Sequence, residues 1–130
     1  MIPKCVLLID DDDDFTTLME LIFEKDPDWQ IITAIKAKEG IFKAQLEQPD
    51  VILLDIMMPN LNGLDVYKIL KSDLTTCTIP IIFVTSMTPL AEILEWQITE
   101  DVEVITKPFD ILELPNQLNE LYDSWSLSSN

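Results

Sequence analysis

The feature that most constrains the fold of this chain is a regular alternation of short apolar runs with longer segments of helical periodicity. Five runs rich in Val, Ile and Leu lie at residues 6–9, 31–35, 51–54, 81–84 and 102–105. Short runs that contain few polar residues are typical of strands covered on both faces of a sheet. We therefore expect five buried strands, each followed by a helical segment.

The segments between these runs predict helices, because their apolar residues recur every three or four positions. We expect helices at residues 15–23 and 38–48, from residue 63 onward, after residue 89, and at 111–125. Such alternation predicts an α/β fold: a doubly wound (βα)5 unit with a five-stranded parallel sheet, right-handed crossovers and helices on both faces. The domain is expected to span residues 1–125, with a frayed tail at 126–130.

The charge balance narrows the chemistry. The chain of 130 residues has 8 basic residues, all lysines, against 24 acidic ones and no histidine, for a net charge of −16. Catalysis that needs histidine is excluded, and the negative charge argues against binding nucleic acid or an anionic membrane. No apolar run approaches the roughly 18 residues that a membrane span requires, and no signal peptide precedes Asp10, so we expect a cytoplasmic protein. Cys5 and Cys77 are expected to be reduced thiols without a role.

Polar residues follow four of the five predicted strands. Asp10 and Asp11 follow the first strand, Asp55 the third, Thr85 the fourth and Lys107 the fifth. The carboxyl ends of parallel strands share one edge of the sheet, where ligands bind in folds of this class. Close carboxylates repel one another unless a cation lies among them, and hard oxygen ligands favour Mg²⁺. A carboxylate, a hydroxyl, a lysine and Mg²⁺ are the groups that phosphoryl transfer to aspartate requires.

The polar residues after the strands, and the acidic run next to them, also have simpler explanations. The run Asp12, Asp13 and Asp14 is more simply explained as a helix start, where acidic side chains interact favourably with the helix dipole. A lone Asp, Thr or Lys after a strand is often a turn residue. The joint occurrence at four strand ends is what favours a site.

Four segments of the chain resemble the receiver domain of two-component response regulators. They are VLLIDDDDDF at 6–15, PDVILLDIMMPNLNGLD at 49–65, IPIIFVTS at 79–86 and ITKPFD at 105–110. Their LDxxMPxxxG element, at residues 54–63, is highly specific. The resemblance covers the whole chain and implies a flavodoxin-like strand order, 2-1-3-4-5.

The resemblance implies a role for each acidic residue. Asp55 would accept a phosphoryl group from a sensor histidine kinase, a phosphotransfer protein or a small phosphodonor. Asp11, Asp55 and the backbone carbonyl of Met57 would bind Mg²⁺ directly, and Asp10 would hold a coordinating water. The chain would be a phosphoprotein of a phosphorelay and not an enzyme beyond its own phosphorylation and dephosphorylation.

The resemblance also implies how the signal would leave the site. Thr85 would bind a phosphoryl oxygen and Lys107 would pair with the phosphate, so that phosphorylation alters the face formed by the fourth helix, fifth strand and fifth helix. We expect no output domain, so a stand-alone receiver would signal by contact with an unknown downstream protein. A homodimer through the same face is a further expectation.

The chain departs from the family pattern at the expected switch and around the acceptor. Val104 stands where receivers usually carry Tyr or Phe, which leaves Trp96 as a substitute for that aromatic switch. Met57 and Met87 occupy positions that influence attack of water on the phosphoaspartate. Thioethers orient water poorly, so we expect a long-lived phosphoryl state; the alternative is that both methionines only pack over the site.

Two other functions fit parts of the pattern. One is a receiver-like interaction module that works without phosphorylation, which the valine at position 104 leaves open. The other is an Mg²⁺-dependent phosphatase of the haloacid dehalogenase type, with its aspartate nucleophile after the first strand. The short chain and the match around Asp55 argue against the phosphatase.

Overall fold

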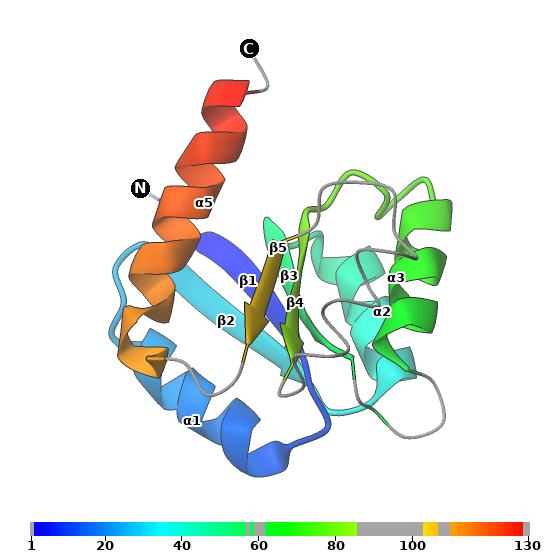
Figure 1. Cartoon of the computed structure of the whole chain (residues 1–130), viewed down its shortest axis with the longest axis horizontal. Coiled ribbons are helices and arrows are strands. Elements are labelled where there is room, and N and C mark those ends of the chain that lie inside the picture. Colours follow the sequence, from blue (N-terminus) through cyan, green and yellow to red (C-terminus); the bar gives the residue numbers. More distant parts are fainter. Residues whose placement is uncertain (1, 57, 59–61, 86–102, 107–109, 129–130) are drawn as a thin grey trace.

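The computed structural model describes residues 2–56, 58, 62–85, 103–106 and 110–128. Within these ranges the chain forms one five-stranded parallel sheet in the order β2-β1-β3-β4-β5 (Figure 1). The strands are β1 (Lys4–Ile9), β2 (Trp29–Ala34), β3 (Val51–Asp55), β4 (Ile81–Thr85) and β5 (Glu103–Thr106). The helical elements are α1 (Asp13–Glu24), α2 (Ala37–Glu47), α3 (Gly63–Ser72), η1 (Ile111–Glu113) and α5 (Leu114–Ser128). The predicted fold class and strand order are confirmed.

Helices cover both faces of the sheet. α1 and α5 lie on one face, and α2 and α3 lie on the other (Figure 1). Alternate residues of β1 divide between the two layers: Val6 and Leu8 join the cluster with α1 and α5, while Leu7 and Ile9 join the one with α2 and α3. All four side chains are fully buried, as a central strand with two covered faces requires.

Short polar side chains begin three of the helical elements. Asp12 accepts a hydrogen bond from the Phe15 N–H at 3.1 Å, which caps the first turn of α1. Asn62 does the same for α3, and Asp110 for η1. The helix-start role expected of Asp12 is confirmed, and Asp13 and Asp14 lie in the first turn of α1.

Several predicted boundaries differ from those of the structure. β2 begins at Trp29, two residues before the predicted start, because pairing with Lys4 extends the ladder beyond the apolar run. The last helix reaches Ser128, so residues 126–128 are helical where we expected a frayed tail. A short 3₁₀ turn, η1, precedes α5 where one continuous helix was predicted. The helix predicted after residue 89 lies outside the described residues.

α5 packs against the first residues of β1 and β2. The indole N–H of Trp29 donates to the side-chain oxygen of Asn119 at 2.7 Å, and its ring meets Tyr122 edge-on at 5.9 Å. The Lys4 ammonium lies over both rings, at 5.2 and 5.4 Å from their centroids. These contacts fix α5 across β1 and β2 at the end of the sheet opposite to the predicted site.

Candidate functional site

The strand register brings the predicted site residues to one edge of the sheet. Ile9 pairs with Leu54, so the next residues along each strand, Asp10 and Asp55, are neighbours. Asp55 in turn pairs with Val84, one residue before Thr85. The alignment follows from the parallel pairing of three strands that are distant in sequence.

Three carboxylates gather at this edge. Oxygen atoms of Asp10, Asp11 and Asp55 all lie within 4.8 Å of one another. Asp10 is fully buried and Asp55 is 6% exposed, whereas Asp11 is open to solvent. The cluster therefore has a buried floor and an accessible side.

The backbone around Asp10 holds this arrangement in place. Its N–H donates to the Ala34 carbonyl at 3.0 Å, which ties the end of β1 to the end of β2. Its carboxylate accepts the Asp12 N–H at 2.9 Å, which ties the site to the residue that caps α1. The same turn thus positions a site carboxylate and starts a helix.

The cluster is chemically suited to a hard cation. Two carboxylates at about 4 Å repel by roughly 4 kcal/mol at an effective dielectric constant near 20. Mg²⁺ binds through one or two carboxylates and keeps waters that substrate phosphate oxygens can replace. The donor set of Asp10, Asp11 and Asp55 fits this preference, since it contains oxygen ligands alone and has one solvent-facing member.

Both glycines of the chain pack against strands that carry site aspartates. A Cβ at Gly63 would lie 2.3 Å from the Asp55 carbonyl oxygen and 2.7 Å from the Ile56 Cα. A Cβ at Gly40 would lie 2.6 Å from the side chain of Ile9. The sequence pattern predicts Gly63 as a helix start and as the end of the LDxxMPxxxG element, but not this packing role. The signal for the packing role is that glycine occurs just twice in 130 residues.

The remaining predicted site residues are described in part or not at all. Thr85 is the last residue of β4 and pairs with Thr106, the residue before Lys107. The residues Met57, Met87, Trp96 and Lys107 lie outside the described ranges. Val104 is partly buried and packs against the core cluster on the α2 and α3 face. An aliphatic side chain therefore occupies the position expected for the aromatic switch residue.

Comparison with known proteins agrees with this geometry. Residues 6–119 match the family model of the response regulator receiver domain. The chain is 32% identical over 112 residues to the alkaline phosphatase synthesis transcriptional regulatory protein PhoP of Bacillus subtilis, which covers 85% of this chain and 45% of PhoP. It is 31% identical over 114 residues to protein PilH of Pseudomonas aeruginosa, covering 88% of this chain and 93% of PilH.

A solved structure gives the same picture. The receiver domain of a Francisella response regulator superposes with a TM-score of 0.78 at 30% identity, covering 93% of this chain and 98% of that one. The chain spans about half the length of several curated relatives, such as PhoP, and nearly the whole length of PilH. Among the described residues, no helix is long and apolar enough to cross a membrane.

Proposed function

This chain belongs to the receiver domains of two-component response regulators, and on that premise we propose that it is a phosphorylation-dependent switch whose phosphoryl acceptor is Asp55. The observation that carries the proposal is the meeting of three carboxylate oxygens within 4.8 Å at the C-terminal edge of the sheet. Receiver domains are signalling proteins and not enzymes in the usual sense. They receive phosphoryl groups from histidine kinases or phosphotransfer proteins.

Among the three aspartates, Asp10 is fully buried and Asp11 is open to solvent, so intermediate burial supports Asp55 as the nucleophile. Its side chain is 6% exposed at the end of β3, and α3 begins directly against its backbone through Gly63. Asp11, by contrast, is exposed and marks the side from which a donor would approach. A nucleophile that is held rigidly beside the solvent-exposed side of the cluster loses little conformational entropy when the donor binds.

The proposed reaction is an in-line transfer. One carboxylate oxygen of Asp55 forms a bond to phosphorus while the bond from phosphorus to the donor nitrogen breaks, and the departing imidazole keeps the electron pair and takes up a proton. Bound Mg²⁺ would supply positive charge against the phosphoryl oxygens. Asp11, Asp55 and the Met57 carbonyl would hold the ion directly, and Asp10 would hold it through a water.

Two further residues complete the proposed site. The Thr85 hydroxyl would donate to one phosphoryl oxygen, and the Lys107 ammonium would neutralise another. Their support is that Thr85 ends β4 and pairs with Thr106, the residue that precedes Lys107 in the sequence. The new group adds a charge of about −1.5 to −2 at this edge, which would reorganise the surface near it.

The proposal extends to output and location. The signal would pass by contact with a downstream protein, and a homodimer through the fourth helix, β5 and α5 is the form of self-association that we propose. We also propose a cytoplasmic location, for which the free thiols of Cys5 and Cys77 are the support. The phosphatase alternative has no support in the family assignment, whereas the phosphorylation-independent module is distinguished by experiment.

The proposal is tested by incubation with acetyl phosphate and Mg²⁺, followed by intact-mass measurement. We expect the wild type to gain the mass of one phosphoryl group, and Asp55→Asn to gain none. Asp28→Asn is the matched control, because Asp28 is an exposed aspartate far along the chain from the cluster; it should label like the wild type. A wild-type protein that stays unlabelled with Mg²⁺ present would favour the phosphorylation-independent module.

A further inference from the structure

The outer edge of β2 has an unusual pattern of occupied and unoccupied backbone groups. Among the described strands, β2 ends the sheet and pairs with β1 alone. The Asp28 and Ala34 carbonyls accept hydrogen bonds from the N–H groups of Lys4 and Asp10, at 2.9 and 3.0 Å, so the even-numbered residues here face β1. Because successive residues of a strand alternate in direction, the N–H and C=O groups of residues 29, 31 and 33 face outward.

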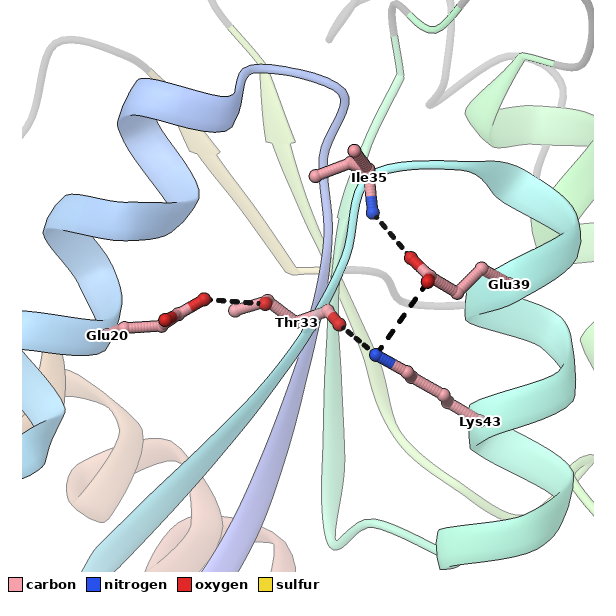
Figure 2. A network of polar contacts seen from close by, with 5 residues as sticks. All are labelled: Glu20, Thr33, Ile35, Glu39 and Lys43. Carbon is pink, nitrogen blue, oxygen red and sulfur yellow. Dashed lines mark hydrogen bonds and ion pairs between the residues drawn. The ribbon is translucent and has the colours of Figure 1, made fainter.

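Side chains cap both ends of this outer edge. The Trp29 N–H donates to the Asp26 carboxylate at 3.1 Å. At the other end the Lys43 ammonium donates to the Thr33 carbonyl at 2.6 Å, and the Ile35 N–H donates to Glu39 at 3.0 Å (Figure 2). Capped ends limit pairing with another strand to the residues between them.

Four outward backbone groups remain between the caps. They are the Trp29 carbonyl, both groups of Ile31 and the Thr33 N–H, and within the described part of the chain no side chain bonds to them. Ile31 and Thr33 are partly exposed, whereas Trp29 is 1% exposed, so the outward groups of Ile31 and Thr33 are the ones that a partner could reach. Their order is that of a short edge to which one further strand of about three residues can pair.

A groove runs beside these groups. It has a volume of about 820 Å³ and is lined by β2, by α1 and by Lys43 of α2. The α1 wall presents Glu20, Leu21 and Glu24, all exposed, with Leu21 61% exposed. Glu20 also accepts a hydrogen bond from the Thr33 hydroxyl at 2.7 Å, which holds this wall against the strand (Figure 2).

The acidic residues that line the groove favour a basic partner. Glu20, Glu24 and Asp26 line it. Lys43 is the one cation among the described residues that line it, and it already lies 4.0 Å from Glu39 and bonds to the strand. We propose that the outer edge of β2 binds a basic, extended segment of a partner protein, which adds to the sheet as a short strand. Lysine or arginine side chains of the segment would face the α1 acids, and an apolar side chain would cover Leu21.

A second copy of this chain is a poorer occupant. Pairing β2 with β2 would bring two acidic α1 walls together in a protein of net charge −16. Like charges across an interface oppose association. The proposed site lies on the edge strand beside α1 and α2 and does not depend on phosphorylation of Asp55.

The test uses a capped heptapeptide of alternating lysine and valine as the probe, with binding followed by amide NMR. We expect shifts and slowed hydrogen exchange at the Ile31 and Thr33 amides. The same peptide with N-methylated valines keeps its charge but loses main-chain donors, and a peptide of alternating glutamate and valine reverses the charge; both should bind at least about tenfold more weakly. Equal binding of the N-methylated peptide, or shifts confined to residues 11–14, would overturn the proposal.

Variants separate the two parts of the site. Glu20→Gln with Glu24→Gln should weaken the lysine peptide roughly fivefold, whereas Glu47→Gln with Glu120→Gln, which removes the same charge outside the groove, should not. Ile31→Pro removes an outward N–H that no β1 bond uses and should abolish the protection of Thr33. If this variant fails to fold by circular dichroism, the N-methylated peptide still tests main-chain pairing on the wild type. Self-association of the wild type that Ile31→Pro abolishes would instead assign the edge to a second copy.

Discussion

At the scale of single residues, Gly63, which has no side chain, controls how closely α3 packs against the acidic cluster. Gly63 lets the first turn of α3 lie directly on the backbone that carries Asp55, and its own N–H donates to the Ile56 carbonyl at 2.9 Å. Any side chain there would push against main-chain atoms, which cannot move without displacing the carboxylate. The packing of one residue thus controls the geometry of another that carries the chemistry.

Gly63→Ala should therefore destabilise the fold although alanine favours helices. We expect a loss of about 1–3 kcal/mol in the free energy of unfolding, measured with urea, because the added methyl meets backbone at 2.3 Å. Phosphoryl labelling by acetyl phosphate should also slow. Gly40→Ala is the comparison: its methyl would meet the Ile9 side chain, which can partly adjust, so its cost should be smaller. Equal stability of Gly63→Ala and wild type would contradict this account.

The thiol of Cys5 gives the protein a predictable response to alkaline pH. Burial, together with the smaller effect of the nearby charges of Asp50 and Glu47, raises the pKa of this thiol from 9.0 to about 11. Its stabilising contribution is complete below pH 9 and is lost as pH rises toward 11, because the unfolded chain releases the proton first.

Urea unfolding of the wild type and of Cys5→Ser between pH 8 and pH 11 checks this, in steps of roughly half a unit. The wild type should lose more stability than the variant over the upper part of that range. Parallel curves for the two proteins would show that the thiol has the same pKa in the folded and unfolded chain.

At the scale of elements, α3 and the segment that follows it act as one packed unit. The Lys71 ammonium donates to the carbonyls of Cys77 and Ile79, at 3.2 and 3.0 Å, and the Thr76 hydroxyl donates to the Leu70 carbonyl at 2.6 Å. These bonds fold the connection from α3 to β4 back onto its own helix. They fix where β4 begins, and therefore where Thr85 ends it.

Lys71→Met should expose how much this connection depends on the ammonium. The methionine keeps the aliphatic stem but leaves two partly buried carbonyls without a donor, so we expect a loss of about 1–3 kcal/mol in unfolding free energy. Lys68→Met, one turn earlier on the exposed side of α3, removes the same charge and should cost little. Similar losses in both variants would show that the effect is one of net charge.

At the scale of the whole molecule, excess negative charge opposes compaction, and the acidic cluster concentrates that repulsion. With a net charge of −16, repulsion is spread over the surface and is screened by any salt. Repulsion among three carboxylates within 4.8 Å, two of them buried, is screened less. A divalent cation bound there should stabilise the fold more than salt alone.

We expect MgCl₂ to raise the melting temperature by several degrees above NaCl at equal ionic strength. Binding to the folded state alone contributes about 2.7 kcal/mol when the ion is at roughly a hundred times its Kd. Asp11→Asn should have opposite effects in the two conditions: a higher melting temperature without Mg²⁺, because repulsion falls, and a much smaller response to Mg²⁺. A full Mg²⁺ response in this variant would place the ion elsewhere.

Much of the architecture could be predicted from local patterns. Apolar runs located the strands, and Asp12 marked a helix start, because periodicity and capping involve residues close together in the chain. Boundaries were less accurate where they depend on distant partners: β2 begins at Trp29 because Lys4 pairs with it. The 3₁₀ turn before α5 likewise has no clear signature in periodicity.

The candidate site divides in the same way. Local patterns were sufficient for the identity of the acidic residues, their place after apolar runs, the excess of charge and the family. The folded arrangement alone brought three carboxylates within 4.8 Å, set Gly63 against the Asp55 backbone and left four open groups between the capped ends of β2. These relations depend on strand register and on packing between segments that are distant in the chain. Many different local sequences could form the same strands and helices, so local pattern does not determine these distances. The geometry is fixed only when the sheet assembles.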